Sequence, residues 1–344
     1  MLYDIWLSEL NYPISGKRKW LSVHKSAENV YNFFTENRFL FDSELSLEHA
    51  KVILDNCEKN RIHVHLLSEF GIPDYGELPF LLYCKGEIRR EHSACGIVGA
   101  RRCTPYGKHI TEELAASCAL QHITVVSGMA KGVDAIAHTA ALKKGGYTIA
   151  SLGCGPDICY PAEHKGLYEE ICARGLVISE YPPGTHATRY TFPRRNRLIA
   201  AFSDKLAVTE AGKRSGALIT CERARHYGKP VYAFPGPIDS PESEGTNNLI
   251  YTGAARMYRK EDFFDMPEQL CLPDTCCPQD ESEGNASSIL CEKIINYLSE
   301  HNRQCDLSAL GSYLSLDAGN LITIITELEM EDICRTEGEN IWLL

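Results

Sequence analysis

The most chemically distinctive stretch of the sequence is 189–197, Arg-Tyr-Thr-Phe-Pro-Arg-Arg-Asn-Arg, which holds four arginines and two aromatic residues. Guanidinium groups bind phosphate through paired hydrogen bonds, and aromatic rings stack on unpaired bases. The composition therefore indicates contact with single-stranded nucleic acid. An architectural alternative stays open, in which Arg195 and Arg197 pair with Glu180 and Glu210 and fasten the edge of a sheet.

Glycines and small polar residues cluster after six apolar runs that have the length of β-strands. In open α/β sheets, ligands bind beyond the carboxyl ends of the strands, where helix N-termini offer free amide groups to anions. Tight turns use the same residue types, but six of them along one edge, two with paired cations, favour a phosphate-binding edge. They lie at 99–102, 127–132, 153–155, 179–180, 210–216 and 235–236.

The elements that position this edge alternate in type along the middle of the chain. Apolar runs predict strands at 96–98, 124–126, 147–152, 176–179, 205–209 and 231–234. Amphipathic patterns predict helices at 106–120, 134–144, 163–174 and 216–227. Strands that alternate with helices in this way form right-handed βαβ crossovers. We therefore expect an α/β domain with a parallel sheet covered on both faces.

Known nucleotide fingerprints and catalytic patterns are incomplete. Glycines 153 and 155 lack the third glycine of a dinucleotide motif at Ile158, and 207–214 lacks both the first glycine and the Ser or Thr of a P-loop. No serine stands in a nucleophile elbow, and the histidines and cysteines do not have the spacing of metal ligands. We expect no catalytic residue, no metal and no cofactor.

Composition is that of a globular protein, with 344 residues, 44% hydrophobic and 24% charged. This length suggests roughly two to three domains. No apolar run approaches the ~20 residues of a membrane span, and the N-terminus does not read as a secretory signal, so we expect a cytoplasmic protein. The 15 cysteines are then expected as reduced thiols, with Cys154, Cys159, Cys276 and Cys277 as the ones to test.

Charge is unevenly distributed around a formal net charge of -11. Residues 87–262 hold 23 Lys and Arg against 18 Asp and Glu, whereas 263–344 hold 3 against 16. Such asymmetry suggests that the middle of the chain contacts nucleic acid.

The chain divides by composition into four parts. Helical patterns at 28–34 and 47–59 predict a small helical domain over 1–70, followed by the α/β domain over 71–264. A polar, acidic linker covers 265–285. Helical patterns at 288–298, 307–314 and 318–328 and a hairpin at 333–343 suggest a winged helix over 286–344. Because 304–334 contains no Lys or Arg, we expect that module to contact protein and not duplex DNA.

An ordered series of motifs carries a family resemblance. Ile-Val-Gly-Ala-Arg at 97–101 is followed by Ser-Gly-Met-Ala-Lys-Gly-Val-Asp at 127–134, Leu-Gly-Cys-Gly at 152–155 and Phe-Pro-Arg-Arg-Asn-Arg at 192–197. Glu-Ala-x-x-x-Ser-Gly-Ala-Leu-Ile-Thr at 210–220 and Gly-Thr-Asn-Asn-Leu-Ile at 245–250 complete it. The series closely resembles the bacterial DNA-processing protein A (DprA/Smf) family.

This resemblance implies an extended Rossmann-like domain that binds single-stranded DNA in a basic pocket, between a SAM-like helical domain and a winged helix. Arg101 would bind phosphate. Family members usually carry Ser or Thr where Ala100 stands, so contact there would use the backbone N–H. The DNA-binding residues implied are Gly99, Ala100, Arg101, Arg102, Ser127, Gly128, Phe192, Arg194, Arg195, Asn196, Arg197, Ser215 and Gly216.

The resemblance also implies partners and a role. The chain would dimerise, protect incoming single-stranded DNA and load a RecA-type recombinase during natural transformation, without being an enzyme. The alternative is a nucleotide-processing enzyme similar to the lysine-decarboxylase-like phosphoribohydrolases, with Glu180 or Glu210 as general base. Those enzymes carry a Pro-Gly-Gly-x-Gly-Thr signature, and the nearest segment of this sequence, 210–216, does not contain it.

Overall fold

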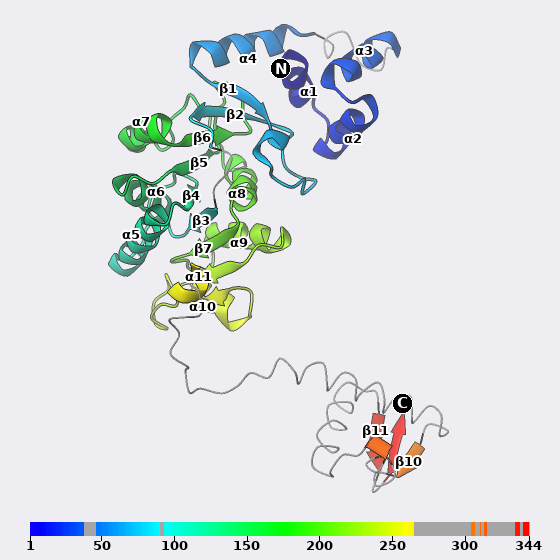
Figure 1. The fold of residues 1–344 in the computed structure, drawn as a ribbon, viewed down its shortest axis with the longest axis vertical. Helices are drawn as coiled ribbons and strands as arrows, with labels where there is room; N and C mark the ends of the chain where they lie inside the picture. The colour runs from blue at the N-terminus through cyan, green and yellow to red at the C-terminus, as the bar shows by residue number, and fades with distance from the viewer. Residues whose placement is uncertain are drawn as a thin grey trace. The chain divides into compact units, whose positions relative to one another are not determined.

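The computed structural model describes residues 1–37, 46–89 and 93–264, together with 304–306, 310, 313–314, 334–337 and 340–343 (Figure 1). The chain forms two compact units, Met1–Met266 and Pro267–Leu344. Among the described residues, no helix is long and apolar enough to cross a membrane.

A nine-stranded sheet organises the first unit, in the order β1-β2-β6-β5-β4-β3-β7-β8-β9. The strands are β1 His63–Leu66, β2 Leu81–Gly86, β3 Ala94–Val98, β4 Thr124–Ser127, β5 Thr148–Leu152, β6 Leu176–Ser179, β7 Lys205–Val208, β8 Val231–Ala233 and β9 Arg256–Met257. The six predicted strands are confirmed to within two residues at each end. The prediction of a parallel sheet is wrong at one edge, because β1 pairs antiparallel with β2 and β2 pairs antiparallel with β6.

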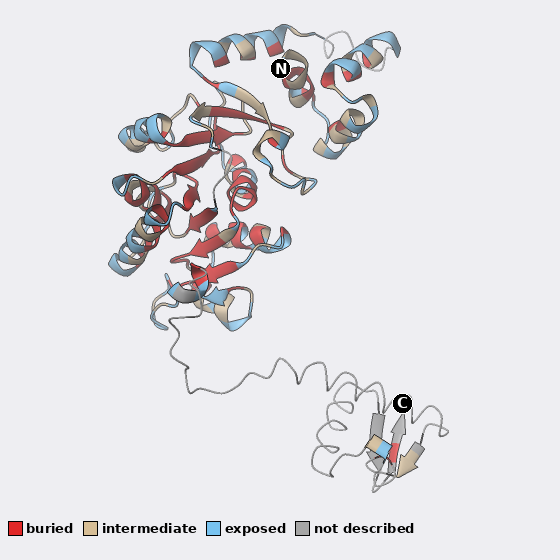
Figure 2. Cartoon of the chain, in the orientation of Figure 1, coloured by how far each residue is buried: buried red, intermediate tan, exposed pale blue. Residues whose placement is uncertain are grey.

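Helices cover both faces of this sheet, as predicted. Figure 1 shows α5, α6 and α7 on one side and α8 and α9 on the other. Their bounds are α5 Pro105–Leu120, α6 Val133–Lys143, α7 Lys165–Arg174, α8 Thr191–Ala201 and α9 Ala217–His226, and α10 Glu244–Tyr251 and α11 Lys260–Phe263 follow. The central strands read as continuous apolar runs because they are buried on both faces (Figure 2).

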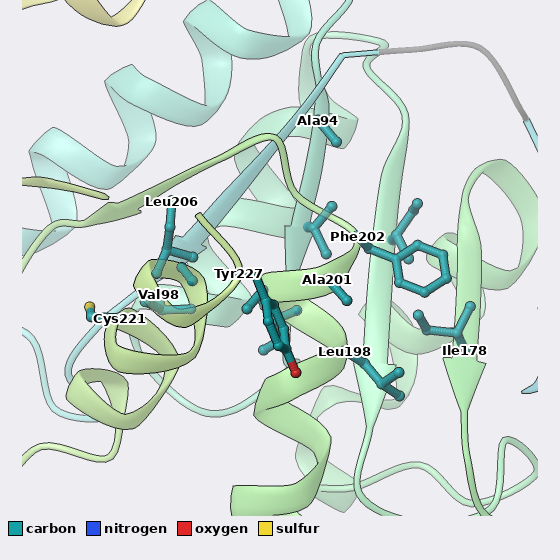
Figure 3. Packing of buried hydrophobic residues seen from close by; sticks show 14 of the residues in the cluster. Ala94, Val98, Ile178, Leu198, Ala201, Phe202, Leu206, Cys221 and Tyr227 are labelled. Carbon is teal, nitrogen blue, oxygen red and sulfur yellow. The ribbon is translucent and has the colours of Figure 1, made fainter. Parts of the chain in front are cut away.

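The core on the α8 side shows how the sequence anchors these helices. Leu198, Ala201 and Phe202 from α8 and its C-terminal end pack with Leu206 of β7 and Tyr227 at the end of α9 (Figure 3). Because α8 is packed against the sheet along this face, its first turns are held at the carboxyl edge.

In the part of the chain that the structure describes, four helices precede the sheet: α1 Leu2–Glu9, α2 Ile14–His24, α3 Ala27–Asn37 and α4 Glu48–Lys59. The last two confirm the predicted helical patterns. Their apolar faces enclose Trp6, Phe34 and Ile53, and this cluster continues onto Tyr83 of β2. The helices are thereby joined to the sheet within one compact unit, and the SAM-like assignment stays a prediction.

The second unit contains a three-stranded sheet in the order β10-β12-β11, formed by Gln304–Asp306, Cys334–Glu337 and Asn340–Leu343. The antiparallel pair β11 and β12 agrees with the predicted hairpin. The linker, with Cys276 and Cys277, and most residues of the three predicted helices lie outside the described residues, so the winged helix stays a prediction.

Candidate nucleic-acid interface

A pocket of about 760 Å³ lies at the carboxyl edge of the sheet and is called here the switch-point pocket. From β3 the chain runs outward to β4, β5 and β6, and it then returns to place β7 on the other side of β3. In open α/β sheets, ligands bind at such a reversal of strand order. The pocket is lined by the loops after β3 and β7, at 99–102 and 212–216, and by the start of α8.

Glu210 fixes the loop after β3. Its carboxylate is buried and accepts hydrogen bonds from the Thr104 N–H at 3.1 and 3.2 Å and from the Thr104 hydroxyl at 2.6 Å. Thr104 in turn caps α5 by accepting the Gly107 N–H. Glu210 therefore has a structural role, and neither the predicted pairing with arginine nor the role of a general base fits its position.

The backbone of this loop lies close to its neighbours. A Cβ on Gly99 would lie 2.7 Å from a methyl group of Val133, so a side chain there would clash. The Ala100 N–H donates to the Glu210 carbonyl at 2.7 Å. Because this N–H already has a partner within the protein, the predicted phosphate contact through the Ala100 backbone is wrong. The loop instead presents the side chains of Arg101 and Arg102, both exposed.

Arg195 is among the residues that line the pocket, but its guanidinium is bonded within the protein. The residue is 4% exposed, and its Nη1 donates to the carbonyl of Ser151 at 2.7 Å and to that of Gly128. These two carbonyls belong to β5 and to the residue that follows β4. A Cβ on Gly128 would overlap the guanidinium, which explains the glycine. Burial lowers the pKa of Arg195, and the nearby Asp134 carboxylate opposes this shift.

Arg197 is also internal. Its side chain is 7% exposed and forms an ion pair with Glu180, whose side chain is 4% exposed. Its Nε donates to the Arg194 carbonyl at 3.0 Å. The architectural alternative is therefore confirmed for Arg197 with Glu180. Arg194 lies 3.6 Å from the same carboxylate but is 57% exposed, so it remains open to solvent.

The remaining predicted residues divide between the pocket and the protein interior. Phe192, Asn196, Ser215 and Gly216 line the pocket. Ser127 is buried, and its hydroxyl donates to the Ile97 carbonyl at 2.6 Å. Ser127 and Gly128 therefore shape the sheet edge behind the pocket and are not among its lining residues.

Aromatic and cationic side chains meet at the pocket wall. The Arg101 guanidinium lies 5.4 Å from the centre of the Phe192 ring, within the range of a cation–π contact. Tyr160, 47% exposed, lies 5.4 Å from the same ring, centre to centre. These groups form a surface on which an unpaired base can stack beside a positive charge.

The sequence reasoning missed several lining residues. Tyr160, Arg189, Lys213 and Arg214 line the pocket, whereas Arg101 and Arg102 are the only cations that the sequence analysis assigns to it from outside α8. The signals were present, since Tyr160 precedes a proline, Arg189 opens the cationic stretch and 213–214 is a pair of cations. Within the described residues, Arg101, Arg102, Arg189 and Arg214 form no ion pair, whereas Lys213 pairs with Glu244 at 3.1 Å.

A family model for DNA recombination-mediator protein A matches residues 68–268. The DNA processing protein DprA of Streptococcus pneumoniae is 38% identical over 227 residues, which cover 64% of this chain and 77% of that protein. A relative from Mycobacterium tuberculosis (strain H37Rv) is 43% identical over 190 residues. The match covers 54% of this chain, and the chain spans about half the length of that relative, 49%.

Two solved structures share the fold. DNA processing protein A from Helicobacter pylori, described for its unique single-stranded DNA binding mode, superposes with a TM-score of 0.54 at 33% identity, covering 60% of this chain and 96% of that one. DprA from S. pneumoniae superposes with a TM-score of 0.57 at 31% identity, covering 74% and 87%.

Proposed function

Because the chain belongs to the DNA recombination-mediator protein A family, we propose that it binds single-stranded DNA in the switch-point pocket, without catalysing a reaction and without sequence preference. The observation that carries this proposal is the placement of exposed cations beside aromatic rings at the reversal of strand order. Arg101 and Arg102 supply charge for phosphates, and Phe192 and Tyr160 supply rings for bases.

Lack of sequence preference follows from the chemistry of these groups. Guanidinium groups neutralise phosphates, which every nucleotide carries, and every base has a face that can stack. Binding of this kind weakens steeply as salt rises, because neutralised phosphates release their counterions.

Fluorescence anisotropy with labelled oligonucleotides at about 50 and 200 mM salt tests the proposal. We expect Arg101→Ala to weaken binding to all sequences alike and to lower the salt slope by about 0.7. The matched control is Lys144→Ala, which removes an exposed positive charge from the C-terminal end of α6, at the opposite edge of the sheet. Equal binding by wild type and Arg101→Ala would remove the pocket from the proposal.

We further propose that the chain acts as a homodimer that protects incoming single-stranded DNA and loads a RecA-type recombinase onto it during natural transformation. Family membership supports this step. Sedimentation of the purified protein tests the dimer. Recombinase filament formation on strands coated with single-strand binding protein, with and without this chain, tests the loading. No acceleration of filament formation would contradict the mediator role while leaving DNA binding in place.

A further inference from the structure

An exposed aromatic side chain stands just outside the switch-point pocket. Tyr190 is 66% exposed and immediately precedes the first residue of α8. It is not among the residues that line the pocket, whereas Arg189 before it and Phe192 two residues after it are. Single exposed aromatic residues are common on protein surfaces, so what distinguishes Tyr190 is how its ring is held.

A closed turn positions Arg189 and Tyr190 beside the pocket. The Thr191 N–H donates to the Thr188 carbonyl at 3.2 Å, which is the hydrogen bond of a β-turn with Arg189 and Tyr190 at its centre. The buried Thr191 side chain closes the turn a second time, because its hydroxyl donates to the same carbonyl at 2.9 Å and accepts the Thr188 N–H at 3.0 Å. Both central residues are exposed, so the turn presents them to solvent.

Arg189 fixes the orientation of the Tyr190 ring. Its guanidinium carbon lies 4.7 Å from the centre of the ring, and its Nη2 donates a hydrogen bond to the Tyr190 hydroxyl. The contact has the geometry of a cation–π pair. Because Arg189 also lines the pocket, one side chain joins the pocket to the ring. A ring that is held before a ligand arrives loses less side-chain entropy on binding.

The chemistry of this pair suits an unpaired nucleotide. An aromatic face stacks on any base, and a guanidinium group binds phosphate. The pocket wall offers the same two contacts through Phe192 and Arg101. The turn therefore repeats the chemistry of the pocket wall at a position that a strand leaving the pocket can reach.

A protein partner is the other class of ligand that exposed tyrosine and arginine favour. The centre of a protein interface is apolar and excludes water. The exposed residues of 186–194 other than Tyr190 are polar apart from Pro193, so they do not supply such a centre. The continuity with the switch-point pocket favours DNA as the ligand.

We infer that the turn with Arg189 and Tyr190 is a stacking platform for the DNA strand that the switch-point pocket holds. The first base outside the pocket stacks on the Tyr190 ring, and Arg189 contacts the phosphate that connects this base to the nucleotides inside. This inference rests on the proposed function and assigns to the strand a contact beyond the pocket.

The affinity of the full chain for oligonucleotides of about 4 to 16 nucleotides tests the platform. We expect Tyr190→Ala to lower the affinity for long strands about 5- to 150-fold, the effect of one lost stack between a base and an aromatic ring. The shortest strands, which fill the pocket alone, should bind Tyr190→Ala like the wild type. Because no charge is removed, the loss should be the same at low and high salt, unlike the loss in Arg101→Ala.

Tyr190→Phe is the matched control, because it keeps the ring and removes only the hydroxyl. It should bind strands of every length like the wild type. Circular dichroism of both variants verifies that they are folded, which the exposure of Tyr190 leads us to expect.

An abasic nucleotide moved along a long strand provides a second, independent measurement. At one position it removes the base that stacks on Tyr190, so it should lower the affinity of the wild type and of Tyr190→Phe by the same factor as Tyr190→Ala does. At that position it should have no added effect on Tyr190→Ala, because the two changes remove the same contact.

The outcomes separate the platform from the proposed function. If Arg101→Ala weakens binding but Tyr190→Ala binds long strands like the wild type, the platform is wrong and the function stands. If Arg101→Ala has no effect, the function is wrong. If Tyr190→Phe loses as much affinity as Tyr190→Ala, the hydroxyl and not the ring makes the contact, and stacking is wrong. If Tyr190→Ala binds DNA normally but no longer forms dimers or no longer accelerates filament formation, the turn contacts protein, which overturns the DNA assignment.

Discussion

Replacing Arg197 by alanine should unfold the protein more easily and should not primarily affect DNA contact. The Arg197 and Glu180 side chains are 7% and 4% exposed and face each other. Removing one partner of a buried ion pair leaves an uncompensated charge and typically costs about 3–5 kcal/mol. Arg197→Ala also loses the hydrogen bond to the Arg194 carbonyl. For a unit of this size, that loss lowers the midpoint of thermal unfolding by roughly 6–20 °C.

Arg194→Ala is a matched control on the same helix. Arg194 lies 3.6 Å from the same carboxylate, but its side chain is 57% exposed. Exposed pairs contribute roughly 0.2–1 kcal/mol, so the expected cost of Arg194→Ala is several-fold smaller. A double variant, Arg197→Met with Glu180→Leu, should recover most of the stability, because well-packed apolar residues often replace a buried pair without loss.

The assay is urea unfolding followed by circular dichroism, with DNA binding measured separately at a temperature where both variants remain folded. Folded Arg197→Ala should keep its affinity for strands that fill only the switch-point pocket, because Arg197 does not line it. The reasoning fails if Arg197→Ala and Arg194→Ala have equal stability, or if Arg197→Ala is stable but cannot bind these strands.

Three further predictions concern the framework behind the pocket. Gly128→Ala would force Arg195 off its carbonyl partners at a cost of about 1–3 kcal/mol; Gly16→Ala, where a Cβ meets nothing within 4 Å, is the control in urea unfolding. Thr104→Ala removes the cap of α5 and should cost about 0.5–2 kcal/mol by the same assay; an unchanged midpoint would contradict that role. Burial lowers the pKa of His138 to about 3, with a further contribution from Arg195. The native state therefore stays neutral while the unfolded chain takes up a proton below its ordinary pKa of about 6.5, so this contribution to stability declines as pH falls from about 6.5 towards 3. His138→Gln should flatten the dependence of unfolding free energy on pH in this window; identical slopes would show that His138 does not stay neutral.

The pH prediction agrees with the local hydrogen bonding. The Thr148 hydroxyl donates to the Val125 carbonyl at 2.7 Å and lies 2.7 Å from Nδ1 of His138. Because the only hydrogen of that hydroxyl is used in the bond to Val125, the hydroxyl can only accept from His138, which must donate from Nδ1. Its Nε2 is buried and has no partner among the described residues. A proton there would place a charge in an apolar environment, which explains the low pKa.

Much of the fold was predictable because its central strands are unambiguous. Continuous apolar runs bounded by glycine turns, such as Thr148–Leu152, have the pattern of strands buried on both faces. The two antiparallel strands at the edge were missed. His63–Leu66 alternates polar and apolar residues over only four positions, and Leu81–Gly86 begins with a run that suits a strand or a buried helix equally well. Their pairing depends on distant residues, which periodicity does not report.

The cationic stretch at 189–197 shows why composition overstates the charge that a ligand meets. Successive residues of α8 point about 100° apart, so neighbouring arginines face different surroundings. Arg195 meets the carbonyls at the sheet edge, and Arg197 meets Glu180, whereas Arg194 meets solvent. Which directions are covered depends on how the helix packs, and that depends on residues far away in the sequence. The charge available for DNA is therefore carried mainly by loop arginines such as Arg101, and the salt dependence of binding should follow the number of loop arginines and not the number of arginines in α8.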